Sequence, residues 1–376
     1  MTSPVRELSD VERLNWLRLS RSENVGPINF FQLLHHFGSA EEALRGAPEL
    51  ARHGGRRTLR MCSRAEAKRE IEACAAIGAR LVAAGEPDYP SRLIAILDAP
   101  PLITLIGHGN LLRKRMIAVV GARNASASGM RFARQIAMEL GAEGFAVVSG
   151  LARGIDAAAH DGALAKGTVA VVGGGVDVIY PPENEALHNR IVEQGAIISE
   201  MPLGTIPKGR HFPRRNRIIS GVALGVVVIE AAKRSGSLIT ARLAGEQGRE
   251  VFAVPGSPLD PRCAGANNLI RQGAVLTEGI DDVTAALADM LFQPLDDHRE
   301  AADFAPEPRP SADGEVIDKA RQAITKSLGP TPVSVDEIIR QCQVTTSVVL
   351  TVLLELELAG RLDRHPGNQF SIRFND

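Results

Sequence analysis

IAVVGAR, at residues 117–123, sets the pattern that decides the fold: a short apolar run, then a glycine-rich turn, then a segment with helical spacing. The pattern recurs up to residue 256, as FAVVSG at 145–150, VAVVGGG at 169–175, VVVIE at 226–230 and VFAVPG at 251–256. Apolar runs of four without alternation are typical of strands that are buried on both faces, as in a parallel sheet. The sequence therefore predicts an α/β core with a Rossmann-like, mostly parallel sheet.

The composition limits the kinds of partner. The chain has 376 residues, of which 44% are hydrophobic, and a formal net charge of -1. A chain so nearly neutral is not a bulk polycation, so a nucleic-acid site must be a local patch. The four cysteines are scattered, which favours neither a metal site nor a disulfide framework. No apolar signal segment or membrane-spanning run is present, so we expect a cytoplasmic protein without membrane contact.

The chain divides into four stretches. Residues 1–75 look helical, and the turn Asn24-Val25-Gly26-Pro27 resembles that of a helix-hairpin-helix (SAM-like) module, in which backbone N–H groups approach a phosphate. A small helical bundle without that role fits the same residues. Residues 76–292 carry the sheet. Residues 293–314 are rich in proline and acids and are interpreted as a linker, and residues 315–376 form a last small domain.

The tail has the plan of a winged-helix domain. Its helical patterns fall at residues 316–324, 335–342 and 346–359, and its hairpin at residues 360–372. In a DNA-binding winged helix the third helix would read the groove. Here that helix carries Glu355 and Glu357, and no Lys or Arg lies between residues 345 and 360. The pattern favours a protein contact, and a purely structural appendage fits comparably well.

Two common chemistries find no support in the glycine turns. The first turn is not G-x-G-x-x-G, and the next strand ends in Ser149 rather than in an acid for a ribose hydroxyl, so we expect no NAD. The P-loop motif is absent from the sequence. Ser149, Asp156 and His160 lie close together, but no nucleophile elbow surrounds the serine. We expect Asp156 in the first turn of a helix, His160 as a packed or capping residue, and neither a cofactor nor a metal.

A basic run points instead to anion binding. The segment KGRHFPRRNR, at 208–217, holds five Lys or Arg and no carboxylate. It follows a strand expected at 196–199, so it should form a loop at the carboxyl edge of the sheet, where ligands bind. Several cations, glycine N–H groups and one aromatic suit a phosphate backbone, and Phe212 could stack on a base. The alternative is a basic loop that pairs with Glu200 and Glu230.

Further cations and donors accompany this run. Arg123 lies in the first glycine turn and Arg153 in the second. Ser235-Gly236-Ser237 precedes a predicted helix, where it offers N–H and hydroxyl donors to an anion. The acid-free stretch from residue 110 to 135 contributes Arg113, Lys114, Arg115, Arg131 and Arg134.

The motifs cover the core almost without gaps. They are VVGAR at 119–123 with Ser126 and Gly129, SGLARGID at 149–156 with Ala159 and His160, GGGVD at 173–177 with Tyr180-Pro181 and Asn184, Ser199-Glu200, FPRRNRIIS at 212–220, Glu230-Ala231 with SGS at 235–237, and Val254-Pro255-Gly256. Together they resemble the DNA-processing protein A family (DprA/Smf). This chain has Ala122 where serine is usual in that family and Ser128 where an aromatic is common, which puts one packing or stacking contact in doubt.

The resemblance implies a non-enzymatic protein that binds single-stranded DNA, dimerises through the Rossmann-like domain, loads a RecA-type recombinase during natural transformation and helps to displace single-strand binding protein. It assigns DNA contacts to Arg123 and to Lys208 or Arg210 with Phe212. The full set that we expect at the strand is Gly121, Arg123, Ser149, Gly150, Arg153, Gly174, Lys208, Arg210, Phe212, Arg214, Arg215, Arg217, Ser235, Gly236 and Ser237.

One enzymatic alternative comes from a related fold. Phosphoribohydrolases act on nucleotides with a P-G-G-x-G-T-x-x-E turn. In this chain the corresponding GGGVD, at 173–177, lacks both the threonine and the glutamate. The carboxylate needed for that reaction is therefore missing, and the single-strand binder stays the leading hypothesis.

Overall fold

The computed structural model describes residues 7–56, 58–288, 314–365 and 367–373. The chain forms two compact units. Unit 1 consists mainly of residues 69–301, and unit 2 combines residues 8–68 with residues 302–376. The predicted linker at 293–314 lies outside the described residues, except for its last residue.

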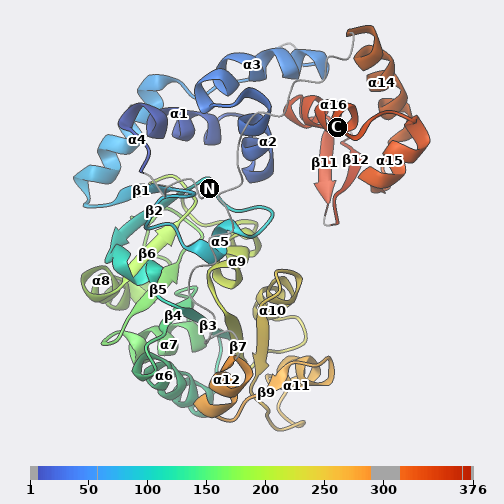
Figure 1. Ribbon diagram of the computed structural model, residues 1–376. Helices are drawn as coiled ribbons and strands as arrows, with labels where there is room; N and C mark the ends of the chain where they lie inside the picture. The colour runs from blue at the N-terminus through green and yellow to red at the C-terminus, as the bar shows by residue number, and fades with distance from the viewer. Residues whose placement is uncertain (1–6, 57, 289–313, 366, 374–376) are drawn as a thin grey trace. The chain divides into compact units, whose positions relative to one another are not determined.

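Unit 1 is built on a nine-stranded sheet of order β1-β2-β6-β5-β4-β3-β7-β8-β9 (Figure 1). The strand pairs from β6 to β9 are parallel, while β1 pairs with β2 and β2 with β6 in antiparallel fashion. The mostly parallel sheet is thus confirmed. The strands are β1 (Arg80–Ala83), β2 (Leu102–Gly107), β3 (Met116–Gly121), β4 (Ala146–Ser149), β5 (Thr168–Val171), β6 (Ala196–Ser199), β7 (Gly225–Ile229), β8 (Glu250–Ala253) and β9 (Val275–Leu276).

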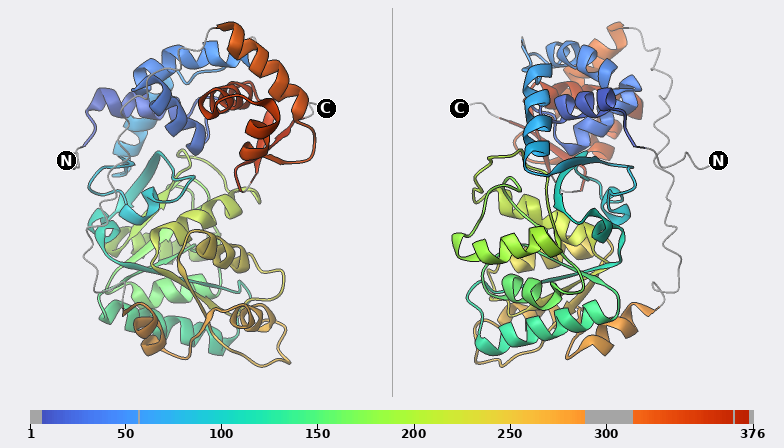
Figure 2. Two further views of the ribbon diagram at one scale, coloured as in Figure 1. Left: turned by 45° about the vertical axis from the view of Figure 1, so that its right-hand side comes forward. Right: turned by 90° about the vertical axis from the view of Figure 1, so that its left-hand side faces the viewer.

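Helices cover both faces of this sheet, which is why its strands are apolar on both sides. The helices α6 (Ala127–Ala142), α7 (Ile155–Ala163) and α8 (Glu185–Gln194) connect β3 to β6 and lie side by side on one face (Figure 2, right). After β6 the chain turns back across the sheet, so right-handed crossovers put the next helices on the other face. These are α9 (His211–Val222), α10 (Ser237–Glu246) and α11 (Ala264–Arg271). Shorter or peripheral elements are α4 (Arg64–Ala76), α5 (Ser91–Ile94), η1 (Gly109–Arg113), η2 (Pro182–Asn184) and α12 (Ile280–Ala286).

The strand order reverses at β3. Strand β4 pairs with one side of β3, and β7, which follows β4 by three crossovers, pairs with the other. Ligands of doubly wound sheets bind outside the carboxyl ends of the strands at such a reversal. Strand β3 ends at Gly121, so the first glycine turn lies at this point.

The basic run at 208–217 is mostly a helix, and the prediction of a loop was wrong beyond its first three residues. Helix α9 begins at His211, whose ring nitrogen Nδ1 accepts from the backbone N–H of Lys208 at 3.3 Å. Pro213 falls in the first turn, where a missing N–H costs no helical hydrogen bond. The helix was not predicted because arginines interrupt the spacing of its apolar residues. Its apolar face is formed by the buried residues Ile218, Ile219 and Val222.

Unit 2 joins the two ends of the chain. The predicted N-terminal helices, the three tail helices and the hairpin are all present, with one additional short strand that pairs with the hairpin. The elements are α1 (Asp10–Ser20), α2 (Pro27–Phe37), α3 (Ala40–His53), α14 (Gly314–Ser327), β10 (Val333–Ser334), α15 (Val335–Cys342), α16 (Thr346–Leu358), β11 (Leu362–His365) and β12 (Gln369–Ile372).

Helix α16 belongs to two apolar clusters at once. Val349, Val352 and Leu353 pack in the core of the winged helix, whereas Leu354 and Leu358 pack among the N-terminal helices. A helix that is apolar all round is buried all round. The third tail helix therefore packs against the N-terminal helices of the same chain; whether the tail also contacts another protein stays a prediction.

The helices of the described residues were compared with the length and hydropathy that a membrane span requires. No single helix there is both long and apolar enough to cross a bilayer. Helices α15 and α16 reach the length and composition only as a pair, and they are bent by 116° where they meet.

Candidate nucleic-acid interface

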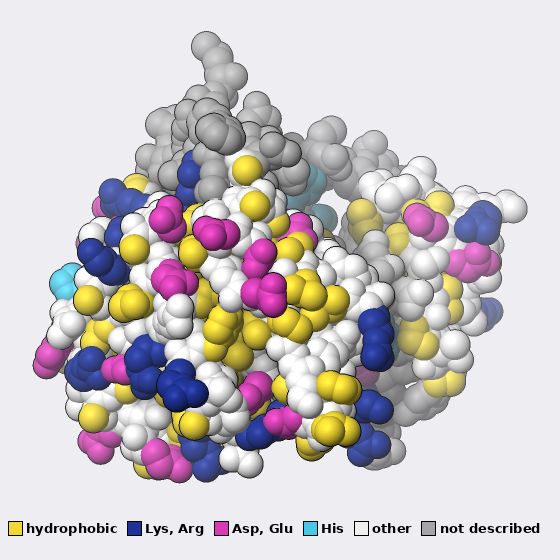
Figure 3. Space-filling model, turned by 90° about the horizontal axis from the view of Figure 1, so that it is seen from below, with side chains coloured by type: hydrophobic (Ala, Val, Ile, Leu, Met, Phe, Trp, Pro, Cys, Tyr) yellow, Lys and Arg dark blue, Asp and Glu magenta, His cyan; other side chains and the backbone are white. Residues whose placement is uncertain are grey.

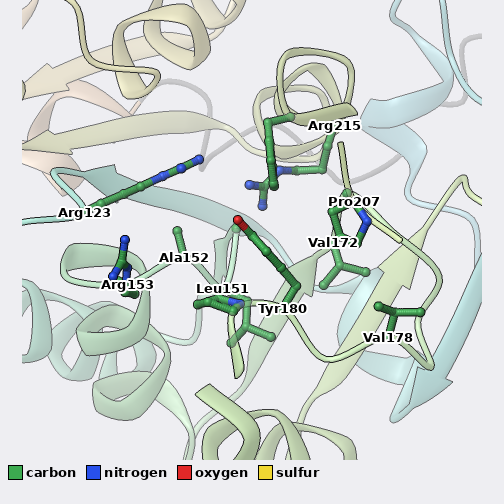
Figure 4. Close-up of a pocket in the computed structure, with 13 residues that line it drawn as sticks. Arg123, Leu151, Ala152, Arg153, Val172, Val178, Tyr180, Pro207 and Arg215 are labelled. Atoms are coloured by element: carbon green, nitrogen blue, oxygen red, sulfur yellow. The ribbon is translucent and has the colours of Figure 1, made fainter. Parts of the chain in front are cut away.

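A pocket of about 50 Å³ lies at the carboxyl edge of the sheet in unit 1 (Figure 4). It is displaced from the strand reversal toward the ends of β4 and β5, and the first turns of α9 close it from the other side. The lining residues come from four segments that are far apart in sequence: Arg123; Gly150, Leu151, Ala152 and Arg153; Val172, Gly173, Val178, Tyr180 and Pro181; and Pro207, Phe212 and Arg215.

Arginine and aromatic side chains meet above this pocket. The Arg123 guanidinium carbon lies 5.2 Å from the centre of the Phe212 ring, and the Phe212 and Tyr180 rings are 5.6 Å apart with a tilt of 36°. Arg123, Arg215 and Tyr180 point toward one another (Figure 4). Cations beside aromatic faces are the combination that holds the phosphates and bases of a single strand.

Two glycines let backbone and side chains approach closely around the pocket. A Cβ atom at position 150 would lie only 2.0 Å from Arg215 Nη1, and one at position 174 only 2.4 Å from the Thr205 carbonyl oxygen. Any larger residue would therefore displace Arg215 or the loop before α9. These positions favour glycine for packing, not for an unusual backbone angle.

Below the pocket lies a buried charged cluster. Arg215 is 6% exposed and its Nη1 donates to the Val171 carbonyl oxygen at 2.6 Å. Burial lowers the pKa of Arg215 to about 10, so the side chain stays cationic at neutral pH. Burial raises the pKa of Asp156, opposed by the charge of Arg215 and by hydrogen bonds from the backbone N–H groups of Ala152 and Gly150. Arg215 thus places a fixed positive charge under the pocket.

His160 and Asp156 have structural roles, as expected. His160 is fully buried, its Nδ1 lies 2.7 Å from Thr168 Oγ1, and burial lowers its pKa to about 3. Asp156 lies in the first turn of α7. Ser149 donates to the Val119 carbonyl oxygen at 2.6 Å, deep inside the sheet. None of these groups is arranged to attack a ligand in the pocket.

Carboxylates of the chain lie at the turns that would hold a dinucleotide. At the N-terminus of α6, Glu230 accepts from the Ser126 backbone N–H at 2.8 Å and also from the Ser126 hydroxyl. In the turn before α7, Asp156 accepts from the N–H groups of Gly150 and Ala152. A helix N-terminus favours one anion. Because Glu230 already lies at the N-terminus of α6, anion binding beside it depends on arginine and lysine side chains.

The predicted cations separate into two groups. Arg214 and the buried Arg217 contact Glu200, at 2.9 Å and 2.5 Å. By contrast, no carboxylate of the described residues lies within ion-pairing distance of the exposed Arg123, Lys208 and Arg210. The alternative of a run paired with acids therefore holds for Glu200 and its two arginines. It does not hold for Glu230, which binds Ser126.

The remaining predicted residues lie at varying distances from the pocket. Gly150, Arg153, Phe212 and Arg215 line it together with Arg123. Arg153 has one long contact with Glu183, at 3.5 Å, and both side chains are more than half exposed. The predicted residues that do not line the pocket are the exposed Lys208 and Arg210, together with Gly121, Ser149, Gly174, Arg214, Arg217 and Ser235-Gly236-Ser237. The serine pair bonds to itself, with 2.7 Å between Ser235 Oγ and Ser237 Oγ.

Sequence reasoning missed the aromatic and apolar part of the lining. Tyr180 was noted only as part of a motif, yet its ring is 43% exposed beside Phe212. Leu151 adopts a φ of +54°, which is rare for a leucine and turns the backbone after β4 toward the pocket. An aromatic three residues after the glycine-rich turn GGGVD, at 173–177, is the signal that could have identified Tyr180.

Away from this edge, charges of both signs are mixed. On the face in Figure 3, Lys and Arg side chains alternate with Asp and Glu side chains, without a continuous area of one sign. This agrees with the net charge of -1. Attraction of a polyanion must therefore come from local groups.

Known proteins resemble this chain throughout its length. The family described as DNA recombination-mediator protein A matches residues 80–288, and the DprA-like N-terminal HHH domain and the DprA winged helix domain match residues 10–73 and 305–368. Protein Smf of Escherichia coli K12 is 39% identical over 296 residues, which is 78% of this chain and 77% of that protein.

Two solved structures are similar as well. That of DNA processing protein A from Streptococcus pneumoniae has a TM-score of 0.61 and 35% identity, and covers 74% of this chain and 98% of that one. A structure on the single-stranded DNA binding mode of DNA processing protein A from Helicobacter pylori has a TM-score of 0.52 and 26% identity, and covers 56% and 96%. The family match over the whole sheet-bearing core and the extensive identity show that the chain belongs to the family of DNA recombination-mediator protein A.

Proposed function

We propose that this chain binds single-stranded DNA without sequence preference at the carboxyl edge of unit 1. The observation that carries the proposal is the Arg123 guanidinium over the Phe212 ring, 5.2 Å from its centre, at the mouth of a pocket with a buried cation beneath it. A cation gives attraction to any phosphate, and an aromatic face stacks on any base, so neither selects a sequence. The Helicobacter pylori relative, whose title names single-stranded DNA binding, supports the same ligand class.

Not all predicted contacts carry equal weight in this proposal. Arg123, Arg153, Lys208, Arg210 and Phe212 reach solvent at this edge and contact the strand. Arg215 supports them from below. Arg217 and Arg214 brace α9 through Glu200, while Ser149 holds the sheet together. Gly121, Gly150, Gly174 and Ser235-Gly236-Ser237 shape the turns around the strand.

The wider role follows from family membership. We propose that the chain acts as a homodimer in the cytoplasm, loads a RecA-type recombinase onto the bound strand and works beside single-strand binding protein. We also propose the domain division 1–75, 76–292, 293–314 and 315–376. No catalytic step is part of the proposal: the pocket lining includes no carboxylate among the described residues, and the nearby Asp156 and His160 are buried in structural contacts.

The binding test uses fluorescence anisotropy with labelled oligothymidylate and a mixed-sequence oligonucleotide. The double variant Arg123→Ala/Lys208→Ala should weaken binding of both oligonucleotides by about 10- to 100-fold, because two phosphate contacts are lost. The slope of log affinity against log salt concentration should also become shallower by about 0.7 for each lost contact. Arg45→Ala, which removes an exposed arginine from α3 in unit 2, is the control. Unchanged affinity in the double variant, or an equal loss in the control, would contradict the assignment.

A further inference from the structure

The acid-free stretch at 110–135 does not form one surface. Arg123 follows β3 at its carboxyl end, whereas Arg113, Lys114 and Arg115 precede the same strand at its amino end. Strand β3 spans Met116–Gly121, so the two groups are separated by about 20 Å of strand at 3.3 Å per residue. We call Arg113, Lys114 and Arg115 the amino-edge ridge.

Two hollows adjoin the amino-edge ridge, and all three ridge residues line both. The first hollow, of about 220 Å³, is also lined by Arg92, Ser91 and Tyr89. The second, of about 520 Å³, is also lined by Glu143, Phe145 and Thr284. Among the described residues, the first hollow has four cations and no carboxylate in its lining, and the second has three cations and one carboxylate.

Local ion pairs do not neutralise this region. Asp88 contacts Arg113 at 2.6 Å, but the same carboxylate also pairs with Arg80. Lys114 Nζ donates only to a neutral group, the Lys166 carbonyl oxygen, at 3.3 Å. Arg113 remains 60% exposed despite its pair. Cations therefore outnumber carboxylates here, in a chain whose net charge is -1.

The shape of the region decides what kind of anion fits it. A solvated basic helix presents its charges on a convex face, whereas these three residues line two hollows, so a bound group can be contacted by several of them at once. Two exposed cations followed by a half-buried one, at consecutive positions, match an anion with repeated charges better than one small ion. A phosphodiester backbone has that repeat, and every cation it meets releases counterions.

We propose that the amino-edge ridge is a second contact for the backbone of the same single strand, reached only by strands long enough to pass from the carboxyl edge around the sheet. The proposal rests on the proposed function at the pocket. It makes the contact depend on length: an oligonucleotide of about 6 nucleotides fills the pocket edge alone, whereas one of about 30 nucleotides reaches both, given site sizes of about 4–16 nucleotides in comparable single-strand binders.

The test compares Lys114→Glu with wild type on labelled oligothymidylates of about 6 and about 30 nucleotides at several salt concentrations. Affinity for the long strand should fall about 5- to 20-fold with a smaller salt slope, while affinity for the short one stays within about twofold. Arg113→Gln, a second variant without charge reversal, should show the same difference at smaller size. Arg242→Glu, at a 65% exposed arginine on α10, is the matched control.

Three outcomes would overturn the proposal: no effect on the long strand, an equal effect on both lengths, or an equal effect in the control. Competition by inorganic phosphate or thymidine monophosphate against the long strand is measured in wild type and in Lys114→Glu. Competition in wild type alone would show that the ridge binds a small anion, and would contradict the proposal. Failure of the proposed function has a different signature, since Arg123→Ala would then leave the short strand bound as in wild type.

Discussion

Two arginines that pack against α16 in unit 2 and Arg123 in unit 1 differ in what faces them. In unit 2, Arg321 pairs at 2.8 Å with Glu355 and Arg364 at 2.7 Å with Glu357, and both glutamates belong to α16 and are almost fully buried. In unit 1, Arg123 has an aromatic ring beside it and a pocket in front of it. The comparison teaches that a count of charges does not locate a polyanion site. An arginine paired with a buried glutamate holds a fold together, and an arginine without one remains available to a phosphate.

Intrinsic probes separate the units in experiments. The chain has one tryptophan and two tyrosines. Trp16 lies in unit 2, where its ring is 5.0 Å from that of Phe30, whereas Tyr89 and Tyr180 lie in unit 1. Tryptophan fluorescence therefore reports the unfolding of unit 2, and tyrosine signals report unit 1.

The largest expected effect is on the stability of unit 2. Leu358→Ala removes a fully buried side chain from the cluster that α16 shares with the N-terminal helices. It should lower the free energy of unfolding reported by Trp16 by about 2–5 kcal/mol, as for other buried leucines. Affinity for a short oligothymidylate should stay within about twofold. If Leu358→Ala weakened binding without lowering stability, the assignment of DNA binding to unit 1 alone would be contradicted.

A somewhat smaller effect is expected at the aromatic of unit 1. Phe212→Ala should weaken oligothymidylate binding by about 1–3 kcal/mol, because one stacked base loses its platform. Phe212→Tyr keeps the ring and should bind like wild type. Equal affinities for the alanine variant and wild type would mean that Phe212 only packs against Tyr180.

The smallest effect, about 1 kcal/mol over the first pH unit below 6.5, extends the comparison through pH. Burial lowers the pKa of His160 to about 3. Below pH 6.5, its ordinary pKa, this histidine is therefore protonated in the unfolded chain but stays neutral in the folded one. Stability is then lost as the pH falls from about 6.5 toward 3, by up to about 1.4 kcal/mol per pH unit. Denaturation followed by tyrosine signals should show this loss relative to His160→Gln, in which that contribution is absent. A wild type that parallels the variant down to pH 4 would contradict a buried, neutral His160.

Much of the fold could be read from local pattern. The runs VAVV and VVVI predicted strands because residues buried on both faces must be apolar throughout, and the tail helices followed from their spacing. Helix α9 was missed because its apolar face is interleaved with Arg215 and Arg217. The partner of α16 could not be identified, since Leu354 and Leu358 show that a second face is buried but carry no information about what covers it.

The sequence predicted the chemistry of the site but not every residue that forms it. Arg123 and Phe212 were placed together because both follow strands at one edge of the sheet, and the structure brings them into contact. The distinction between Arg210 and Arg217 was not predictable. It depends on Glu200, whose carboxylate reaches only one side of α9. Tyr180 enters the pocket through a turn whose course no local pattern specifies.

The central claim is that a single strand lies against Arg123 and Phe212 in unit 1. Ultraviolet crosslinking of a short oligothymidylate to the full chain, mapped by mass spectrometry, tests it most directly. The account predicts adducts at Phe212 and Tyr180 that disappear in Arg123→Ala. Adducts confined to unit 2, for example at Trp16 or on α16, would contradict it.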